Sequence, residues 1–478
     1  MLKTNAETEN LCRRIPQLGR LLESEAARAL LAVWPRELVT EAMRHVLTTL
    51  REEAVSGVLD EASLDGRVQA WQRAVTAELQ RMSRPSLRRV INATGVILQT
   101  NLGRAPLSEA AIRNIEQVAR GYSNLEFDLA TGRRGRRDAH AERLILRLLA
   151  ARGASGPERE HAAMVVNNCA AAVFLALNTL AEGGEVLVSR GELVEIGGGF
   201  RIPDILLKSG ATLREVGTTN RTRIADYARA ITPETRLILR VHRSNFRVEG
   251  FTEQPALEQL VALGREAGVP VFEDQGTGCV VRLEEFGIRE ESSWIRSISS
   301  GANLVSASGD KLLGGPQCGL LVGERRIIDL MRTNPLARVF RPGKLTYAAL
   351  EATVLAYLAG QEETLPAIRM MRVRPAELRA RCEALAGRLQ GSGPEAEVVA
   401  VRSVVGGGTT PGATLGGFAV SLRHAALNEE RLMKALRALD PPVIARTRRG
   451  RVLLDLRTVL PEDDELLARQ LSKLELAS

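Results

Sequence analysis

The stretch Asn303-Leu304-Val305-Ser306-Ala307-Ser308-Gly309-Asp310-Lys311-Leu312-Leu313-Gly314-Gly315-Pro316-Gln317 indicates how the rest of the chain is organised. It is typical of a short apolar strand that ends in Ser-Gly, presents one lysine and enters a glycine-rich turn. A lysine that follows a buried strand among small residues is poorly hydrated, which favours its neutral, nucleophilic form. We therefore expect Lys311 to be a Schiff-base lysine for pyridoxal phosphate.

The use of basic residues favours this interpretation over a surface charge in a loop. Of the 65 lysines and arginines, six are lysines and the other 59 are arginines. Arginine stays protonated and cannot form an imine. A chain that uses arginine at nearly every basic position has a lysine at 311, where this chemistry would require one.

Size and composition predict a globular protein of two or three domains. The chain has 478 residues, 45% of them hydrophobic and 26% charged, with a net charge of +8. That charge favours an anionic partner, either a nucleic acid or a phosphorylated small molecule. The five cysteines are far apart, which predicts neither a zinc site nor disulfides and fits the cytoplasm. No run approaches the roughly 18 apolar residues of a membrane span, so we expect no membrane partner.

Three domains are expected. Residues 1–85 have a helical pattern, and this domain serves either packing and oligomerisation or substrate docking. Residues 86–345 form a large catalytic domain, and residues 346–478 a linking helix and a smaller α+β domain.

The catalytic domain alternates apolar strands with helical segments. The expected strands are residues 163–166, 185–188, 212–216, 237–242, 269–273, 303–307 and 319–322. Continuous apolar strands separated by helices predict a mainly parallel sheet covered on both faces. Ligands of such sheets lie beyond the carboxyl ends of the strands, where Lys311 and Asp274 are expected just past two strand ends.

Two further elements fit the same cofactor. A buried carboxylate can keep the ring nitrogen of pyridoxal phosphate protonated, and Asp274 suits this role unless it only caps the next helix. At Asn168-Cys169-Ala170 a strand meets a helix, whose free N–H groups suit the phosphate. Ser308 is expected to add a hydroxyl group.

A second turn concentrates positive charge. Residues 132–137 contain four arginines, Arg133, Arg134, Arg136 and Arg137, next to Gly132 and Gly135. Such a run is either a solvated loop or a grip on phosphate or a nucleic-acid backbone.

With these pieces assembled, nearly the whole chain resembles the bacterial L-seryl-tRNA(Sec) selenium transferases, also called selenocysteine synthases. The resemblance lies in Ile91–Gly95 with Thr100–Ser108, Tyr122–Leu129, Ser189–Gly198 and Ser308–Gln317. It implies a fold-type-I pyridoxal phosphate enzyme whose N-terminal helical domain docks tRNA. Gln99 and Arg243 depart from the family's usual His and small hydroxyl residue, and we expect both to affect only local substrate contacts.

The resemblance also implies an activity. Lys311 would hold the cofactor and act as the general base on the α-proton of serine esterified to tRNA. The β-hydroxyl would leave, and selenophosphate would supply the selenium of selenocysteinyl-tRNA(Sec). Asp310 would assist proton transfer or orient Lys311.

By the same motif matches, Arg104, Arg338 and Arg341 would bind selenophosphate. The alternatives are that Arg104 caps a turn and that the other two pair with acidic neighbours. The family also implies a homo-oligomer, a decamer built of dimers with active sites at the dimer interfaces.

Two other readings stay open from the residues alone. One is a related pyridoxal phosphate lyase, or β-eliminating enzyme, acting on a small amino acid or amino sugar. The other is a catalytically silent RNA-binding scaffold of the same fold.

Overall fold

The computed structural model describes residues 5–154, 161–196, 198–288, 293–391 and 394–474. Gly197, which belongs to one of the blocks quoted above, lies outside these ranges. The chain divides into two compact units, Met1–Arg89 and Val90–Ser478. The expected helical domain, residues 1–85, falls within the first unit. The second unit contains the other two expected domains except residues 86–89, and their separation at residue 346 stays a prediction.

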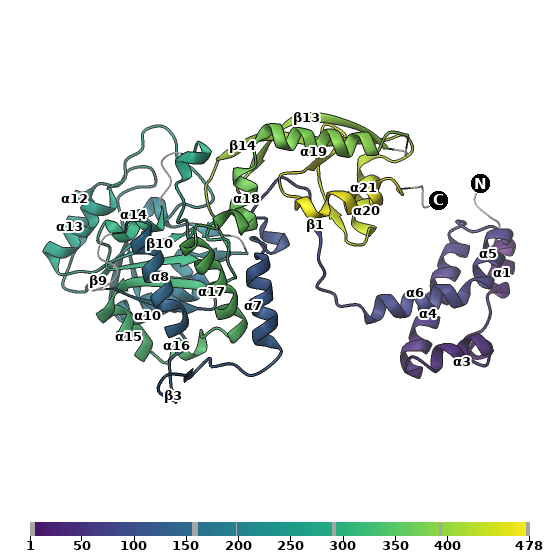
Figure 1. Ribbon diagram of the computed structural model, residues 1–478, viewed down its shortest axis with the longest axis horizontal. Coiled ribbons are helices and arrows are strands. Elements are labelled where there is room, and N and C mark those ends of the chain that lie inside the picture. The colour runs from purple at the N-terminus through teal and green to yellow at the C-terminus, as the bar shows by residue number, and fades with distance from the viewer. Residues whose placement is uncertain (1–4, 155–160, 197, 289–292, 392–393, 475–478) are drawn as a thin grey trace. The chain divides into compact units, whose positions relative to one another are not determined.

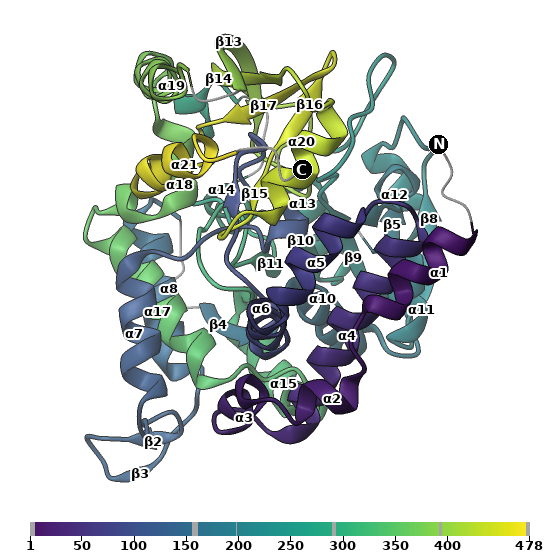
Figure 2. The same ribbon diagram turned by 90° about the vertical axis from the view of Figure 1, so that its right-hand side faces the viewer.

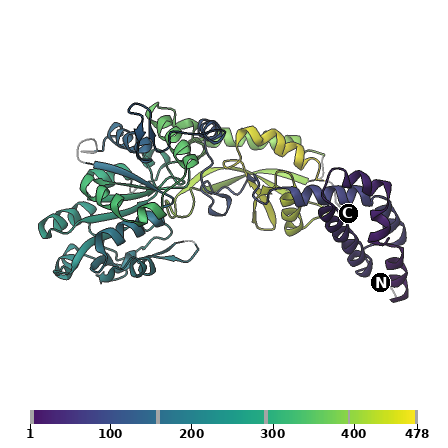
Figure 3. The ribbon, with the colours of Figure 1, turned by 90° about the horizontal axis from the view of Figure 1, so that it is seen from below.

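The first unit consists of helices packed around one apolar core (Figure 3). Its helices are α1 (Asn5–Arg14), α2 (Leu18–Leu22), α3 (Glu25–Leu31), α4 (Arg36–Val55), α5 (Glu61–Gln69) and α6 (Trp71–Ser83). Apolar residues at helical spacing, Val39 and Met43 of α4 and Val75 and Leu79 of α6, are buried in that core. Apolar residues repeating with a period near 3.6 thus line one buried face of each of these two helices.

The second unit is built on a seven-stranded sheet with the order β4-β12-β11-β10-β9-β5-β8 (Figure 1). The strands are β4 (His161–Val166), β5 (Glu185–Ser189), β8 (Thr212–Val216), β9 (Thr235–Val241), β10 (Val271–Gly276), β11 (Leu304–Ser308) and β12 (Gly319–Glu324). In this sheet β12 pairs antiparallel with both of its neighbours, and the other pairs are parallel. All seven expected strands are present, and the mainly parallel sheet is confirmed.

Helices cover both faces of this sheet because successive strand residues point to opposite sides. In β10, Val271 faces one apolar core and Phe272 the other. The first core includes α8 (Ala139–Ala151), α13 (Leu257–Ala267), α14 (Trp294–Ser299) and α17 (Lys344–Leu358); the second includes α10 (Cys169–Ala181), α11 (Ile202–Lys208) and α15 (Arg325–Thr333). Beside α17 lie α7 (Glu109–Ala119) and α8 (Figure 2). The other helices near the sheet are α12 (Ile224–Ala230) and α16 (Leu336–Val339).

The C-terminal residues of this unit form a second, four-stranded antiparallel sheet of order β13-β14-β17-β16. Its strands are β13 (Pro394–Val404), β14 (Thr414–His424), β16 (Arg446–Arg448) and β17 (Arg451–Asp455), with α18 (Pro366–Arg372), α19 (Pro375–Arg388), α20 (Glu429–Ala438) and α21 (Asp464–Leu471). The chain enters the unit at this end, because β1 (Ile91–Asn92) pairs with β15 (Val443–Ile444). Residues 406–412, between β13 and β14, return toward the large sheet.

The cluster of arginines forms a short hairpin, in which β2 (Phe127–Asp128) pairs with β3 (Arg133–Arg134). A second small hairpin joins β6 (Glu195–Ile196) to β7 (Phe200–Arg201). Across the described ranges, no helix combines the length and the apolar character that a membrane crossing needs.

Candidate functional site

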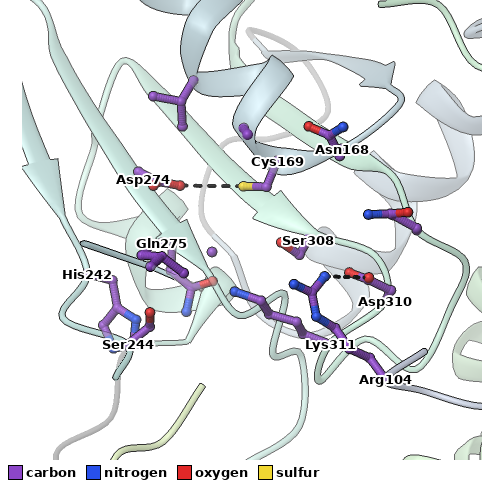
Figure 4. A pocket seen from close by; sticks show the side chains of 15 residues that line it. Arg104, Asn168, Cys169, His242, Ser244, Asp274, Gln275, Ser308, Asp310 and Lys311 are labelled. Atoms are coloured by element: carbon purple, nitrogen blue, oxygen red, sulfur yellow. Dashed lines mark hydrogen bonds and ion pairs between the residues drawn. The ribbon is translucent and has the colours of Figure 1, made fainter. Parts of the chain in front are cut away.

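A cavity of about 280 Å³ opens beside the carboxyl ends of β10 and β11 (Figure 4). We call it the Lys311 cavity. Its lining brings together all eight predicted site residues other than Arg338 and Arg341: Arg104, Asn168, Cys169, Ala170, Asp274, Ser308, Asp310 and Lys311. Segments far apart in the sequence meet here because parallel strands place their carboxyl ends along one edge.

Lys311 is buried, with 8% of its surface exposed, so it is not a surface charge. Burial lowers the pKa of its amine, because desolvation penalises the charged form. Two glycines lie against the amine: a Cβ on Gly276 would be 3.8 Å from Nζ, and a Cβ on Gly408 would be 3.2 Å from it. The backbone therefore leaves space around the Lys311 amine. This amine is neutral more often than the amine of an exposed lysine.

Asp274 lies within β10, not just past its end as expected. The polar residues after Phe272 end the apolar run, yet the backbone continues to pair with β11, where Asp274 lies opposite Ser306. The Ser306 hydroxyl donates a 2.7 Å hydrogen bond to Asp274 Oδ1, and Cys169 Sγ lies 3.5 Å from the same oxygen. These contacts from β11 and α10 hold the carboxylate in the cavity wall, so Asp274 is not a helix cap.

The Cys169 thiol is a hydrogen-bond donor in this arrangement. Burial, followed by the charge of Asp274, raises its pKa to about 12, so the thiol keeps its proton. Its neighbour Asn168 caps the N-terminus of α10, where the Asn168 side chain accepts a 2.8 Å hydrogen bond from the amide of Ala171. The first turn of α10 thus presents N–H groups at the cavity.

Asp310 and Arg104 form an ion pair next to the lysine. Arg104 Nη1 donates a 2.6 Å hydrogen bond to Asp310 Oδ2, and Asp310 is 6% exposed. Arg104 has a φ of +62°, a backbone conformation that few residues other than glycine adopt. Its Nε is buried and has no hydrogen-bond partner within the part of the chain that the structure describes.

Arg338 and Arg341 lie elsewhere. They line a separate cavity of about 280 Å³, the Arg341 cavity, together with Arg134, Arg137 and Glu126. Arg341 and Arg137 both contact Glu126, at 3.1 Å and 2.6 Å. One copy of the chain therefore does not bring all three predicted anion-binding arginines into one cavity.

Sequence reasoning missed several residues of the Lys311 cavity. His242 and Ser244 line it just after β9, and Gln275 follows Asp274. The rule that places ligands beyond strand ends could have found them. Gly408 carries no local signal, because it approaches Lys311 only through the second sheet's long hairpin.

The family model described as "L-seryl-tRNA selenium transferase" matches residues 90–460, and "Selenocysteine synthase N terminal" matches residues 13–51. The chain belongs to the L-seryl-tRNA selenium transferase family. The L-seryl-tRNA(Sec) selenium transferase of Aquifex aeolicus (strain VF5) is 43% identical to this chain over 468 residues. The match covers 98% of this chain and 99% of that relative. Another, from Geobacter sulfurreducens, is 46% identical over 456 residues, 94% of this chain and 96% of the relative.

A solved structure supports the fold. The chain is similar to D-glucosaminate-6-phosphate ammonia-lyase with a TM-score of 0.54 and 20% identity, covering 82% of this chain and 96% of that structure. At this identity the likeness concerns the fold, and it confirms the predicted fold-type-I architecture of pyridoxal phosphate enzymes.

Pyridoxal phosphate is the cofactor that membership of this selenium transferase family indicates. The residues present fit it. A buried amine, a buried carboxylate and the start of α10 surround one cavity. Gly276 and Gly408 keep side chains away from the amine. These are the groups that a covalently held aldehyde with a ring nitrogen and a phosphate requires.

Proposed function

We propose that the chain converts L-seryl-tRNA(Sec) to L-selenocysteinyl-tRNA(Sec) by replacing the β-hydroxyl of serine with selenium. The observation that carries the proposal is the family match over residues 90–460, combined with a buried lysine in the cavity where the cofactor fits. The match of residues 13–51 to the family's N-terminal domain extends it to the helical unit. That unit is proposed to dock the tRNA.

When bound, pyridoxal phosphate withdraws electrons from the amino acid, which acidifies the α-hydrogen and allows the β-substituent to leave. Lys311 would hold the cofactor and, once displaced, take the α-proton at Nζ. Its lowered pKa supports this role, because a general base must be unprotonated near neutral pH. The departing β-hydroxyl takes up a proton and leaves as water.

The other residues position these groups. Asp274, fixed by Ser306, would hold the proton on the ring nitrogen of the cofactor. The start of α10, from Asn168 to Ala170, and Ser308 would hold its phosphate. Asp310, paired with Arg104, would orient the Lys311 amine, since it is the adjacent residue in the chain.

Selenophosphate is proposed as the selenium donor, with Arg104, Arg338 and Arg341 as its binding residues. The buried, unpartnered Nε of Arg104 supports an anion in the Lys311 cavity. Since Arg338 and Arg341 line a different cavity of the same copy, they would have to come from a neighbouring copy. This requirement supports a homo-oligomer. The five free cysteines support a cytoplasmic location.

Mixed oligomers test the shared site. A Lys311→Ala copy and an Arg338→Ala/Arg341→Ala copy should each be inactive alone and regain part of the activity when coassembled. Absence of any regained activity in verified mixed oligomers would mean that the three arginines do not serve one site.

The substrate is tested by binding and conversion. The wild type should bind seryl-tRNA(Sec) more tightly than seryl-tRNA(Ser) and convert only the former when selenophosphate is supplied. Equal affinity for both tRNAs, with no selenium incorporated, would contradict the proposed function.

A further inference from the structure

A third cavity, of about 400 Å³, adjoins the Lys311 cavity at the ends of β9 and β10. We call it the Arg247 cavity. The two cavities share His242 in their linings. The size is that of a small-ligand site, and the groups placed above in cofactor binding do not fill it.

The loop at residues 406–412 links this cavity to the reacting amine. A Cβ on Gly408 would lie 3.2 Å from Lys311 Nζ, and a Cβ on Gly412 would lie 3.6 Å from the guanidinium of Arg247. Pro411, between them, lines the Arg247 cavity. The loop therefore reaches from the reacting amine to the lining of the Arg247 cavity.

The lining is rich in guanidinium groups. Arg240, Arg243 and Arg247 line it, against the carboxyl groups of Glu249 and Glu273. The cavity thus has an excess of positive charge, which suits a phosphate.

The guanidinium groups of Arg240 and Arg243 are held in place by a buried hydrogen-bond network. Arg243 donates a 2.7 Å hydrogen bond to Gln254 Oε1, and Gln254 donates one of 2.5 Å to Glu192. Arg240 lies 3.4 Å from the same Glu192 carboxylate, which is 1% exposed. Arg247, in contrast, is exposed and has no ion pair recorded within the described ranges, so its charge is available to a ligand.

Two further features of the lining favour a ligand with a nucleobase over a simple anion. Glu273 is 5% exposed, and its Oε2 is buried without a hydrogen-bond partner among the described residues. A buried acceptor of this kind is costly unless a donor such as an amino group meets it. Phe246, also in the lining, is 38% exposed and offers a ring on which a base can stack.

We propose that the Arg247 cavity binds the 3′-terminal adenosine of the seryl-tRNA, with its phosphate at Arg243 and Arg247, its base on Phe246 and its amino group at Glu273. The inference rests on the proposed function, since the serine is esterified to the ribose of that nucleotide. With the seryl group at Lys311, the ribose has to lie near His242, which lines both cavities.

The test uses the full-length protein loaded with pyridoxal phosphate. Affinity for tRNA(Sec) is measured by fluorescence anisotropy, with intact tRNA and with tRNA lacking its 3′-terminal adenosine. The wild type should lose about tenfold in affinity on this removal, as expected for one stacked base. Phe246→Ala and Arg247→Ala should weaken binding of the intact tRNA and be nearly insensitive to the removal. Variants that weaken both tRNAs equally, or neither, would overturn the inference.

AMP provides a second probe that does not depend on tRNA docking. It should bind the wild type and Arg265→Ala, and bind Phe246→Ala and Arg247→Ala at least several-fold more weakly. Arg265 is a matched control, because it is an exposed arginine on α13 outside the lining. Unchanged cofactor absorbance in all variants verifies folding. One outcome is that tRNA(Sec) binds, AMP does not bind, and removal of the terminal adenosine leaves the affinity unchanged. The inference is then wrong and the proposed function stands. If AMP binds as expected but tRNA(Sec) does not, the proposed function fails and the nucleotide site stands.

Discussion

The guanidinium of Arg104 donates a 2.6 Å hydrogen bond to the carboxylate of Asp310, the residue that precedes Lys311. This contact joins a segment near residue 100 to the turn that carries the reacting amine. It also places a positive charge near the lysine, which lowers the pKa of its amine in addition to the larger effect of burial. The pair therefore influences both the position and the protonation of Lys311.

Replacing Arg104 should shift this protonation. In Arg104→Ala the pKa of Lys311 should rise, so that the neutral amine appears only at higher pH. The rate of covalent attachment of pyridoxal phosphate to cofactor-free protein, followed by visible absorbance, should then need a higher pH to reach its plateau. Arg104→Lys keeps the charge and should shift the profile less. Identical pH profiles for wild type and Arg104→Ala would contradict this effect.

Gly408 should be required for cofactor attachment. Its φ is +80°, and a Cβ there would lie 3.2 Å from Lys311 Nζ. Gly408→Ala should therefore cost about 1–3 kcal/mol from backbone strain alone and slow attachment about tenfold. Gly407→Ala is the matched control, because a Cβ at Gly407 meets nothing within 4 Å. Equal attachment rates in the two variants would show that Gly408 does not shape the site.

Ser306 should strengthen cofactor binding through Asp274. A hydrogen bond to a charged group contributes about 1.5–3 kcal/mol, so Ser306→Ala should weaken pyridoxal phosphate binding at least about tenfold. Asp274→Asn should have a larger effect on turnover, because an amide cannot hold the proton on the ring nitrogen by charge. Equilibrium dialysis of the cofactor and single-turnover kinetics measure the two effects. A Ser306→Ala variant with wild-type cofactor affinity would disprove the positioning role.

Removing the first unit should separate docking from chemistry. Residues 1–89 form a compact unit with its own apolar core. A chain beginning at Val90 should keep the visible absorbance of bound cofactor and lose affinity for tRNA(Sec). A truncated protein that still binds tRNA(Sec) as tightly as the full chain would refute this division of labour.

Much of the fold is predictable from the sequence because its signals are local. Most of the seven strands contain an apolar run bounded by turn residues, and burial of Lys311 follows from small neighbours at a strand end. The end of β10 is an exception. There the polar Asp274 stays in the sheet because Ser306 of β11 pairs with it.

The arrangement of distant segments could not be predicted in the same way. Motif matches placed Arg104, Arg338 and Arg341 in one site, but the fold of one copy distributes them over two cavities. Gly408 reaches Lys311 through a hairpin whose path no local pattern encodes. Likewise, Glu273 Oε2 lacks a hydrogen-bond partner among the described residues because of the side of β10 that faces the Arg247 cavity.

The central claim is that the Lys311 amine, and no other, bonds to the cofactor. Borohydride reduction of the protein with bound pyridoxal phosphate, followed by peptide mapping, measures this directly. The modified peptide should contain Lys311, and Lys311→Ala should give no modified peptide and no visible cofactor band. Modification of another of the six lysines, or an unchanged band in Lys311→Ala, would contradict the account.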